Sequence, residues 1–205
     1  MSAPVHTPRP SAPAGVIAAF AIGVILAVGV PVLSGCVPVV VAGAAGGAAL
    51  MASDRRTAGA QVEDESIELK ITDQIMKLYG DKVHVNVTSF NGVVLLTGEV
   101  PDQGNAVSIG GIAKNTPKVT SVHNELVVAP LTVLGQRTND TYITSKVKAR
   151  FMEANRFPPT AVKVVTERGV VYLMGIVTRA EGDSAGEIAA TTEGVHRVVK
   201  IFEYR

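Results

Sequence analysis

The chain has 205 residues, a formal net charge of +1 and a single cysteine. This length allows one medium domain or two small ones. The balanced charge excludes nucleic-acid binding through a broad basic surface, because neutralising phosphates requires clustered lysines and arginines. A lone cysteine forms no internal disulfide, and its sequence neighbours offer no ligands for a metal site.

The first part of the chain has the features of a secretion signal. Residues 16–33 are almost wholly apolar and run into the tetrapeptide LSGC at 33–36. A signal peptide and a short membrane anchor both have this composition. The tetrapeptide resembles the lipobox of bacterial lipoproteins, in which the cysteine sulfur receives a diacylglycerol and the chain is cut before it. We therefore predict a signal peptide over 1–35 and a lipid on Cys36, with an uncleaved anchor as the alternative.

Residues 36–62 are interpreted as a lipidated tether rich in glycine and alanine, of which 53–62 is a polar linker. Two or more acyl chains give stable membrane anchoring. The residue after the cysteine is Val37 rather than Asp. By resemblance to enterobacterial lipoproteins, this favours an outer-membrane anchor that faces the periplasm.

Two copies of one unit follow the tether. Residues 92–100 (GVVLLTGEV) and 169–177 (GVVYLMGIV) correspond to each other, and we assign the units to 63–130 and 138–205. The first unit is acidic, whereas the second carries eleven basic residues against eight acidic ones over 137–205. The second unit is therefore the one suited to an anionic surface.

The sequence pattern of each unit predicts helices and strands in the order α-β-β-α-β. The opening helices have apolar residues at four-residue spacing, namely Ile67, Ile71 and Ile75 in the first unit and Ile143, Val147 and Phe151 in the second. The acidic and amide residues near these helices are interpreted as N-terminal charges and caps: Glu63, Asp64, Glu65, Asn139 and Asp140. Turns at 91–92 and 168–169 predict hairpins.

The second strand of each hairpin is nearly all apolar, so it is expected to be central and covered. A second helix is predicted over 102–115 and 179–192, and a last strand over 119–128 and 195–204. The fold class is α+β, with two helices on a three-stranded mixed sheet in each unit.

No catalytic or metal-binding constellation is found in the sequence. None of the four histidines has Cys, His or carboxylate neighbours at metal-ligand spacing. His84 alternates with valines and is expected to face solvent. Gly98 and Gly175 are interpreted as sites of close backbone packing or a bulge. We therefore expect neither an enzyme nor a cofactor.

The α-β-β-α-β unit with glycines flanking its second strand resembles the BON domain, a family named for bacterial osmotic-stress and nodulation proteins. A lipobox followed by two such units, with NDTYIT at 139–144 opening the second, is similar to outer-membrane lipoproteins with two BON domains. The resemblance implies phospholipid binding and support of envelope integrity, without catalysis.

The opening helix of the second unit carries the predicted phospholipid-binding residues. A helical projection places its core residues on one side and an aromatic, thioether, small and basic set on the other: Tyr142, Lys146, Ala149, Arg150 and Met152. Tyrosine suits a membrane interface, and each basic residue adds about 1 kcal/mol against an anionic leaflet. The family resemblance implies that this helix contacts lipid.

Two alternatives remain open at this point. Tyr142 and Met152 could instead pack against the first unit or a linker, because a tandem pair needs an interface. The protein could also be a periplasmic adaptor that docks on an envelope assembly or division complex. The opening helix of the first unit presents Glu68, Lys70 and Asp73 outward and is expected to be solvated.

Overall fold

The computed structural model describes residues 54–131 and 134–205. The predicted signal peptide, Cys36 and most of the tether lie outside the described residues. The described part belongs to one compact unit, Gly43–Arg205. Within it, each of the two sequence repeats folds as a domain.

The first domain has the predicted element order. It contains α3 (Ala58–Tyr79), β1 (His84–Phe90), β2 (Val93–Val100), α4 (Gln103–Lys114) and β3 (Ser121–Val128). β2 is central, with β1 antiparallel and β3 parallel to it. The sheet is mixed because a tight hairpin joins antiparallel strands, whereas the helical crossover through α4 returns the chain in parallel.

The second domain repeats this arrangement. It contains α5 (Leu134–Ala154), β4 (Val162–Glu167), β5 (Val170–Val177), α6 (Arg179–Ala190) and β6 (Arg197–Tyr204). β5 is central, antiparallel to β4 and parallel to β6. The predicted α+β class and the central position of the apolar strands are confirmed.

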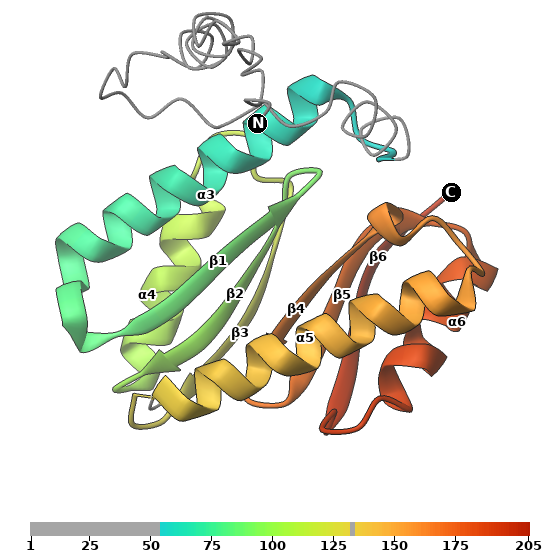
Figure 1. Cartoon of the computed structure of the whole chain (residues 1–205). Coiled ribbons are helices and arrows are strands. Elements are labelled where there is room, and N and C mark those ends of the chain that lie inside the picture. Colours follow the sequence, from blue (N-terminus) through green and yellow to red (C-terminus); the bar gives the residue numbers. More distant parts are fainter. Residues whose placement is uncertain (1–53, 132–133) are drawn as a thin grey trace, which may run out of the picture. The chain divides into compact units, whose positions relative to one another are not determined.

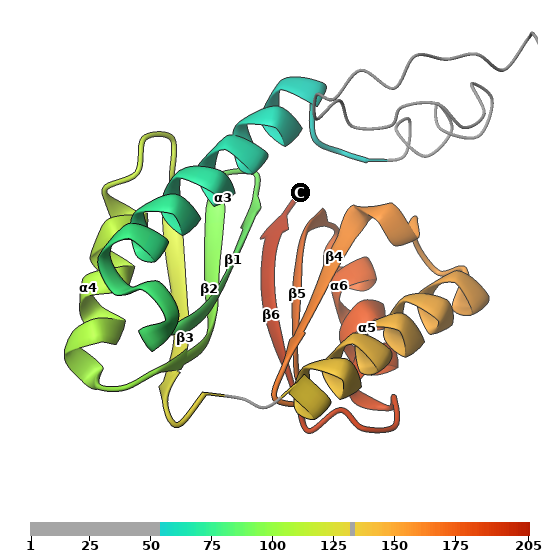
Figure 2. The same ribbon diagram turned by 60° about the vertical axis from the view of Figure 1, so that its left-hand side comes forward.

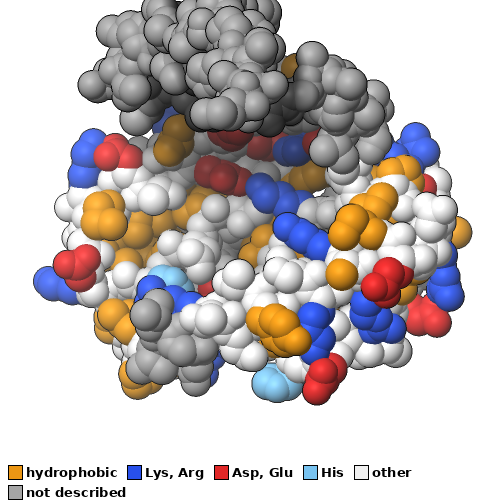
Figure 3. All heavy atoms as spheres, viewed as in Figure 1, with side chains coloured by type: hydrophobic (Ala, Val, Ile, Leu, Met, Phe, Trp, Pro, Cys, Tyr) orange, Lys and Arg blue, Asp and Glu red, His pale blue; other side chains and the backbone are white. Residues whose placement is uncertain are grey.

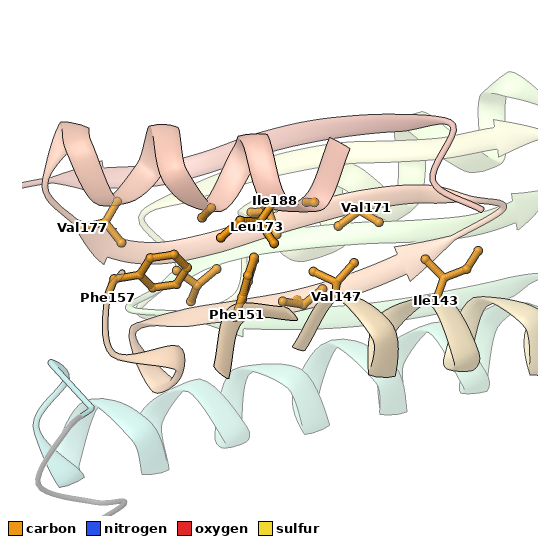
Figure 4. Packing of buried hydrophobic residues seen from close by; sticks show 12 residues of the cluster. Ile143, Val147, Phe151, Phe157, Val171, Leu173, Val177 and Ile188 are labelled. Carbon is orange, nitrogen blue, oxygen red and sulfur yellow. The ribbon is translucent and has the colours of Figure 1, made fainter. Parts of the chain in front are cut away.

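The two helices of each domain cover one face of its sheet (Figures 1 and 2). In the second domain, Ile143, Val147 and Phe151 of α5 point toward the sheet, where they share one core with Val171 and Leu173 of β5 (Figure 4). The Phe151 and Phe157 rings meet edge to face with centroids 5.0 Å apart. The isoleucines of α3 form the equivalent core against β2. The four-residue spacing therefore predicts the core positions correctly.

The other faces of the two sheets pack against each other. Phe90 and Leu95 of the first domain join Tyr172, Met174 and Ile201 of the second in one buried apolar cluster. Each central strand is therefore covered on both sides, which explains why β2 and β5 are apolar almost throughout.

The opening helices begin earlier than the sequence predicts. Thr57 caps α3, and its Oγ1 accepts a hydrogen bond from the Ala60 amide at 3.1 Å. Residues 58–62 are thus helical rather than part of a linker. Among the described helices, none combines the length and the hydropathy needed to cross a bilayer.

Candidate functional site

The outer face of α5 holds two exposed apolar side chains. Tyr142 is 61% exposed and Met152 is 62% exposed. They are ten residues apart, which corresponds to about 15 Å along a helix. In Figure 3, orange side chains lie at the surface among blue and red ones along the course that α5 takes in Figure 1. The alternative in which the first domain covers Tyr142 and Met152 is therefore wrong.

Lys146 lies between a partner of opposite charge and an aromatic ring. Its Nζ is 2.7 Å from Glu193 Oε2 and 5.0 Å from the Tyr142 ring centroid. The hydrogen bond from Lys146 lowers the pKa of Glu193. The Glu193 side chain is 92% exposed, so this ion pair contributes little to stability and is easily exchanged for another anion. Tyr142 and Lys146 thus place an aromatic ring and a cationic group side by side on the surface of α5.

Arg150 is turned away from that pair. Its Nη1 donates hydrogen bonds to the Ile188 carbonyl at 2.9 Å and to Thr192 Oγ1 at 2.8 Å, at the end of α6. A cation at this position complements the negative end of the helix dipole. Ala149 is half-buried. The structure therefore brings Tyr142, Lys146 and Ala149 together, while Arg150 links α5 to α6.

The outer face of α3 is exposed as expected at Lys70 and Asp73, whereas Glu68 is half-buried. The Oε1 atom of Glu68 accepts hydrogen bonds from the Ser89 amide at 2.7 Å and from Lys163 Nζ at 2.9 Å. Lys163 belongs to the second domain, so Glu68 joins the two domains. The exposed large apolar residues of α3 are Val62, Leu69, Met76 and Leu78, each at least 59% exposed.

The predicted helix-capping acids have a different role. Asp64 is buried inside α3, and its carboxylate accepts hydrogen bonds from the Asn91 and Gly92 amides of the first hairpin turn. Asp140 does the same for the Arg168 and Gly169 amides in the second domain. The capping interpretation of these two residues is wrong, because the helices start six residues before each of them.

The segment that leads into α3 contacts both domains. Arg55 forms two hydrogen bonds with Glu181 at 2.6 and 2.7 Å and donates a third to the Ile176 carbonyl, all in the second domain. This pairing lowers the pKa of Glu181 to about 2. Arg56 pairs with Asp64 at 2.8 Å in the first domain. The tether therefore enters the folded region at the junction of the domains.

The junction also holds a polar cluster that the sequence did not indicate. His84 Nδ1 lies 2.8 Å from Glu99 Oε2, and Glu167 of the second domain lies beside them. The expectation that His84 faces solvent is wrong, because the sheet of the second domain covers the outer face of β1. No sequence spacing could have shown this, since the three residues come from three strands and two domains.

Comparison with known proteins agrees with this architecture. The BON domain family matches residues 63–130 and 139–205, so the chain belongs to the BON domain family. It is 38% identical over 174 residues to the outer membrane lipoprotein DolP of Haemophilus influenzae, covering 84% of this chain and 90% of that protein.

Two further relatives share the domains. A 21 kDa hemolysin of Actinobacillus pleuropneumoniae is 33% identical, with 74% of this chain and 79% of that protein covered. The osmotically-inducible protein Y of Escherichia coli is 32% identical, with 71% and 75% covered. The chain is thus a DolP-like protein with two BON domains.

Proposed function

We propose that the chain is a lipoprotein of the outer membrane that faces the periplasm, is anchored through Cys36, and binds anionic phospholipid through α5 of its second BON domain. Its relative of highest identity among those named above is an outer membrane lipoprotein. The role is support of the cell envelope, without catalysis.

The single observation that carries lipid binding is the pairing of exposed Tyr142 with Lys146 on one helix face. A tyrosine ring places an apolar body and a polar tip at the depth where headgroups meet acyl chains. The ammonium group beside it can leave exposed Glu193 for a lipid phosphate, which an anionic leaflet presents at high density. Lys148 is also exposed and adds positive charge to α5.

Replacing Tyr142 and Lys146 together by glutamate is expected to weaken binding to cardiolipin or phosphatidylglycerol vesicles at least tenfold. The substitution removes the interfacial ring and reverses one charge, each of which contributes about 1 kcal/mol or more. A fragment of residues 54–205, which contains both hydrophobic cores, is measured by vesicle co-sedimentation.

The matched control lies on the equivalent helix of the first domain. Ser66→Glu with Lys70→Glu changes the net charge by the same amount at the positions that correspond to Tyr142 and Lys146. This control should bind as the unsubstituted fragment does, and Glu193→Gln should bind more tightly. Equal loss in both double variants, or no vesicle binding at all, would refute lipid recognition by α5.

Cys36→Ala is expected to abolish incorporation of labelled palmitate, because no acyl chain is then attached. Radiolabelling of cells measures the incorporation. Undiminished labelling of the variant would contradict attachment at this cysteine.

An adaptor role is the second candidate, and one observation favours it. Val62, Leu69 and Met76 of α3 are seven residues apart, so they share one face of the helix and remain exposed. Cross-linking from position 69 in cells tests it. A stoichiometric partner lost on Leu69→Glu, together with no vesicle binding by the 54–205 fragment, favours the adaptor.

A further inference from the structure

We propose that His84, Glu99 and Glu167 form a binding site for one divalent zinc-type cation that bridges the two BON domains. The proposal is independent of lipid binding, because none of the three residues belongs to the α5 face. It rests on the donor set, its burial, the strands that position it and the access from solvent.

The donor atoms are already gathered. One imidazole nitrogen and one oxygen from each carboxylate lie within 4.8 Å of one another. Zinc holds nitrogen and oxygen ligands at about 2.0 to 2.2 Å in tetrahedral geometry, which places two ligands of one ion about 3.3 to 3.6 Å apart. Side-chain movements of about 1 Å therefore bring the three atoms to coordination distance. Coordination would replace the present hydrogen bond between His84 and Glu99.

Regular structure positions each ligand. His84 on β1 and Glu99 on β2 are direct partners in the antiparallel pair, so their side chains leave the same face of the first sheet. Glu167 ends β4, in the sheet that packs against that face. Ligands on paired strands are held more rigidly than ligands on loops, as a metal site requires.

Two buried carboxylates make a cation favourable at this place. The Glu99 side chain is fully buried and Glu167 is 6% exposed. Two carboxylates this close inside a protein favour a shared positive charge, which a doubly charged ion would supply in addition to the ion pair of Glu99 with Arg168.

Neighbouring groups orient the ligands. Asn86 Nδ2 donates to Glu167 Oε2 at 2.7 Å, and Arg168 Nη1 lies 3.5 Å from Glu99 Oε1. Hydrogen bonds of this kind fix the ligand geometry in metal sites and are part of their affinity. The cluster thus has an outer shell as well as three ligands.

An ion can reach the cluster from outside. A cavity of about 330 Å³ is lined by His84 and Glu167 together with residues of α5, namely Arg137, Asp140, Thr141 and Thr144. It has room for water, which would complete the coordination sphere of a three-ligand site. The cluster therefore offers suitable ligand identity, an outer shell and an entry path for an ion.

The experiment uses the full chain in detergent, with Cys36→Ser in every variant so that the thiol does not bind the ion. Zinc chloride is titrated by calorimetry, and Co²⁺ is used as a visible spectroscopic probe. We expect one ion per chain, a rise in Tm with zinc, and absorption typical of cobalt with nitrogen and oxygen ligands. His84→Gln and Glu167→Gln should each lower the affinity at least about tenfold.

Two matched variants control for the loss of an imidazole group and for the loss of a carboxylate charge. His196→Gln removes an exposed histidine, and Glu187→Gln removes an exposed carboxylate, both outside the cluster. They should bind zinc as the parent does. Absence of saturable binding to the parent, a stoichiometry other than one, or an equal loss in His196→Gln and His84→Gln overturns the proposal. The parent titration decides the matter even if a cluster variant does not fold.

Discussion

Asp64→Ala is expected to destabilise the first domain by about 3 to 5 kcal/mol, as removal of one partner from a buried charged network does. The Asp64 carboxylate accepts hydrogen bonds from the Ser89 hydroxyl at 2.6 Å and from the amides of Asn91 and Gly92 at 2.8 and 2.9 Å. It also pairs with Arg56 at 2.8 Å. The substitution would leave a hairpin turn and a guanidinium without their shared acceptor. Urea unfolding at neutral pH measures the loss.

Asp73→Ala is the control, because Asp73 is an exposed carboxylate on the same helix. Its ion pair with Lys77 joins two side chains that are 59% and 71% exposed. Such a pair contributes less than about 1 kcal/mol. Similar losses of stability in the two variants would contradict the assigned role of Asp64.

The contribution of Asp64 also depends on pH. Burial alone would raise its pKa, but the hydrogen bonds from Ser89, Gly92, Asn91 and Arg56 outweigh burial and lower the pKa below the ordinary 3.8. A lowered pKa means that the folded state binds fewer protons than the unfolded state. The stabilisation is therefore complete above about pH 3.8 and is lost as the pH falls through the lower value of the folded state. Parent and Asp64→Asn should converge in stability at strongly acidic pH.

Local sequence patterns predicted the fold of each domain because the spacing of apolar residues determines its helices and strands. Four-residue spacing placed Ile143, Val147 and Phe151 in the core, and the continuous apolar run placed β5 at the centre of its sheet. Asp64 was misinterpreted because a carboxylate near a helix start also fits a cap. Its true partners come from a turn more than twenty residues later, and no spacing rule connects the two.

The residues of the candidate site were likewise predicted only in part. Helical periodicity predicted that Tyr142 and Met152 are exposed, which the structure confirms. It could not predict that Arg150 reaches the end of α6, because a long side chain can bend away from the direction of its Cα–Cβ bond. Strand alternation likewise placed His84 on the outer face of β1, but not the second sheet that covers this face. Periodicity tells which residues share a face, whereas tertiary packing decides what lies against it.

Gly98→Ala is expected to destabilise the first domain by about 3 kcal/mol, the sum of a strained backbone and an overpacked contact. Gly98 has φ +121°, a conformation that side chains rarely adopt. A Cβ at this position would also collide with the backbone carbonyl of His84 on β1. The strand pair would have to separate where His84 and Glu99 meet. Thermal unfolding monitored by circular dichroism measures the change.

Gly111→Ala is the matched control, and the opposite sign is expected. Gly111 lies within α4, and a Cβ there would meet no atom within 4 Å. Alanine in a helix interior is more favourable than glycine by about 0.5 to 1 kcal/mol. The same added methyl group should therefore stabilise the protein at Gly111 and destabilise it at Gly98. If both variants were stabilised, the close approach of β1 and β2 at Gly98 would be wrong, and with it the geometry that brings His84 to Glu99.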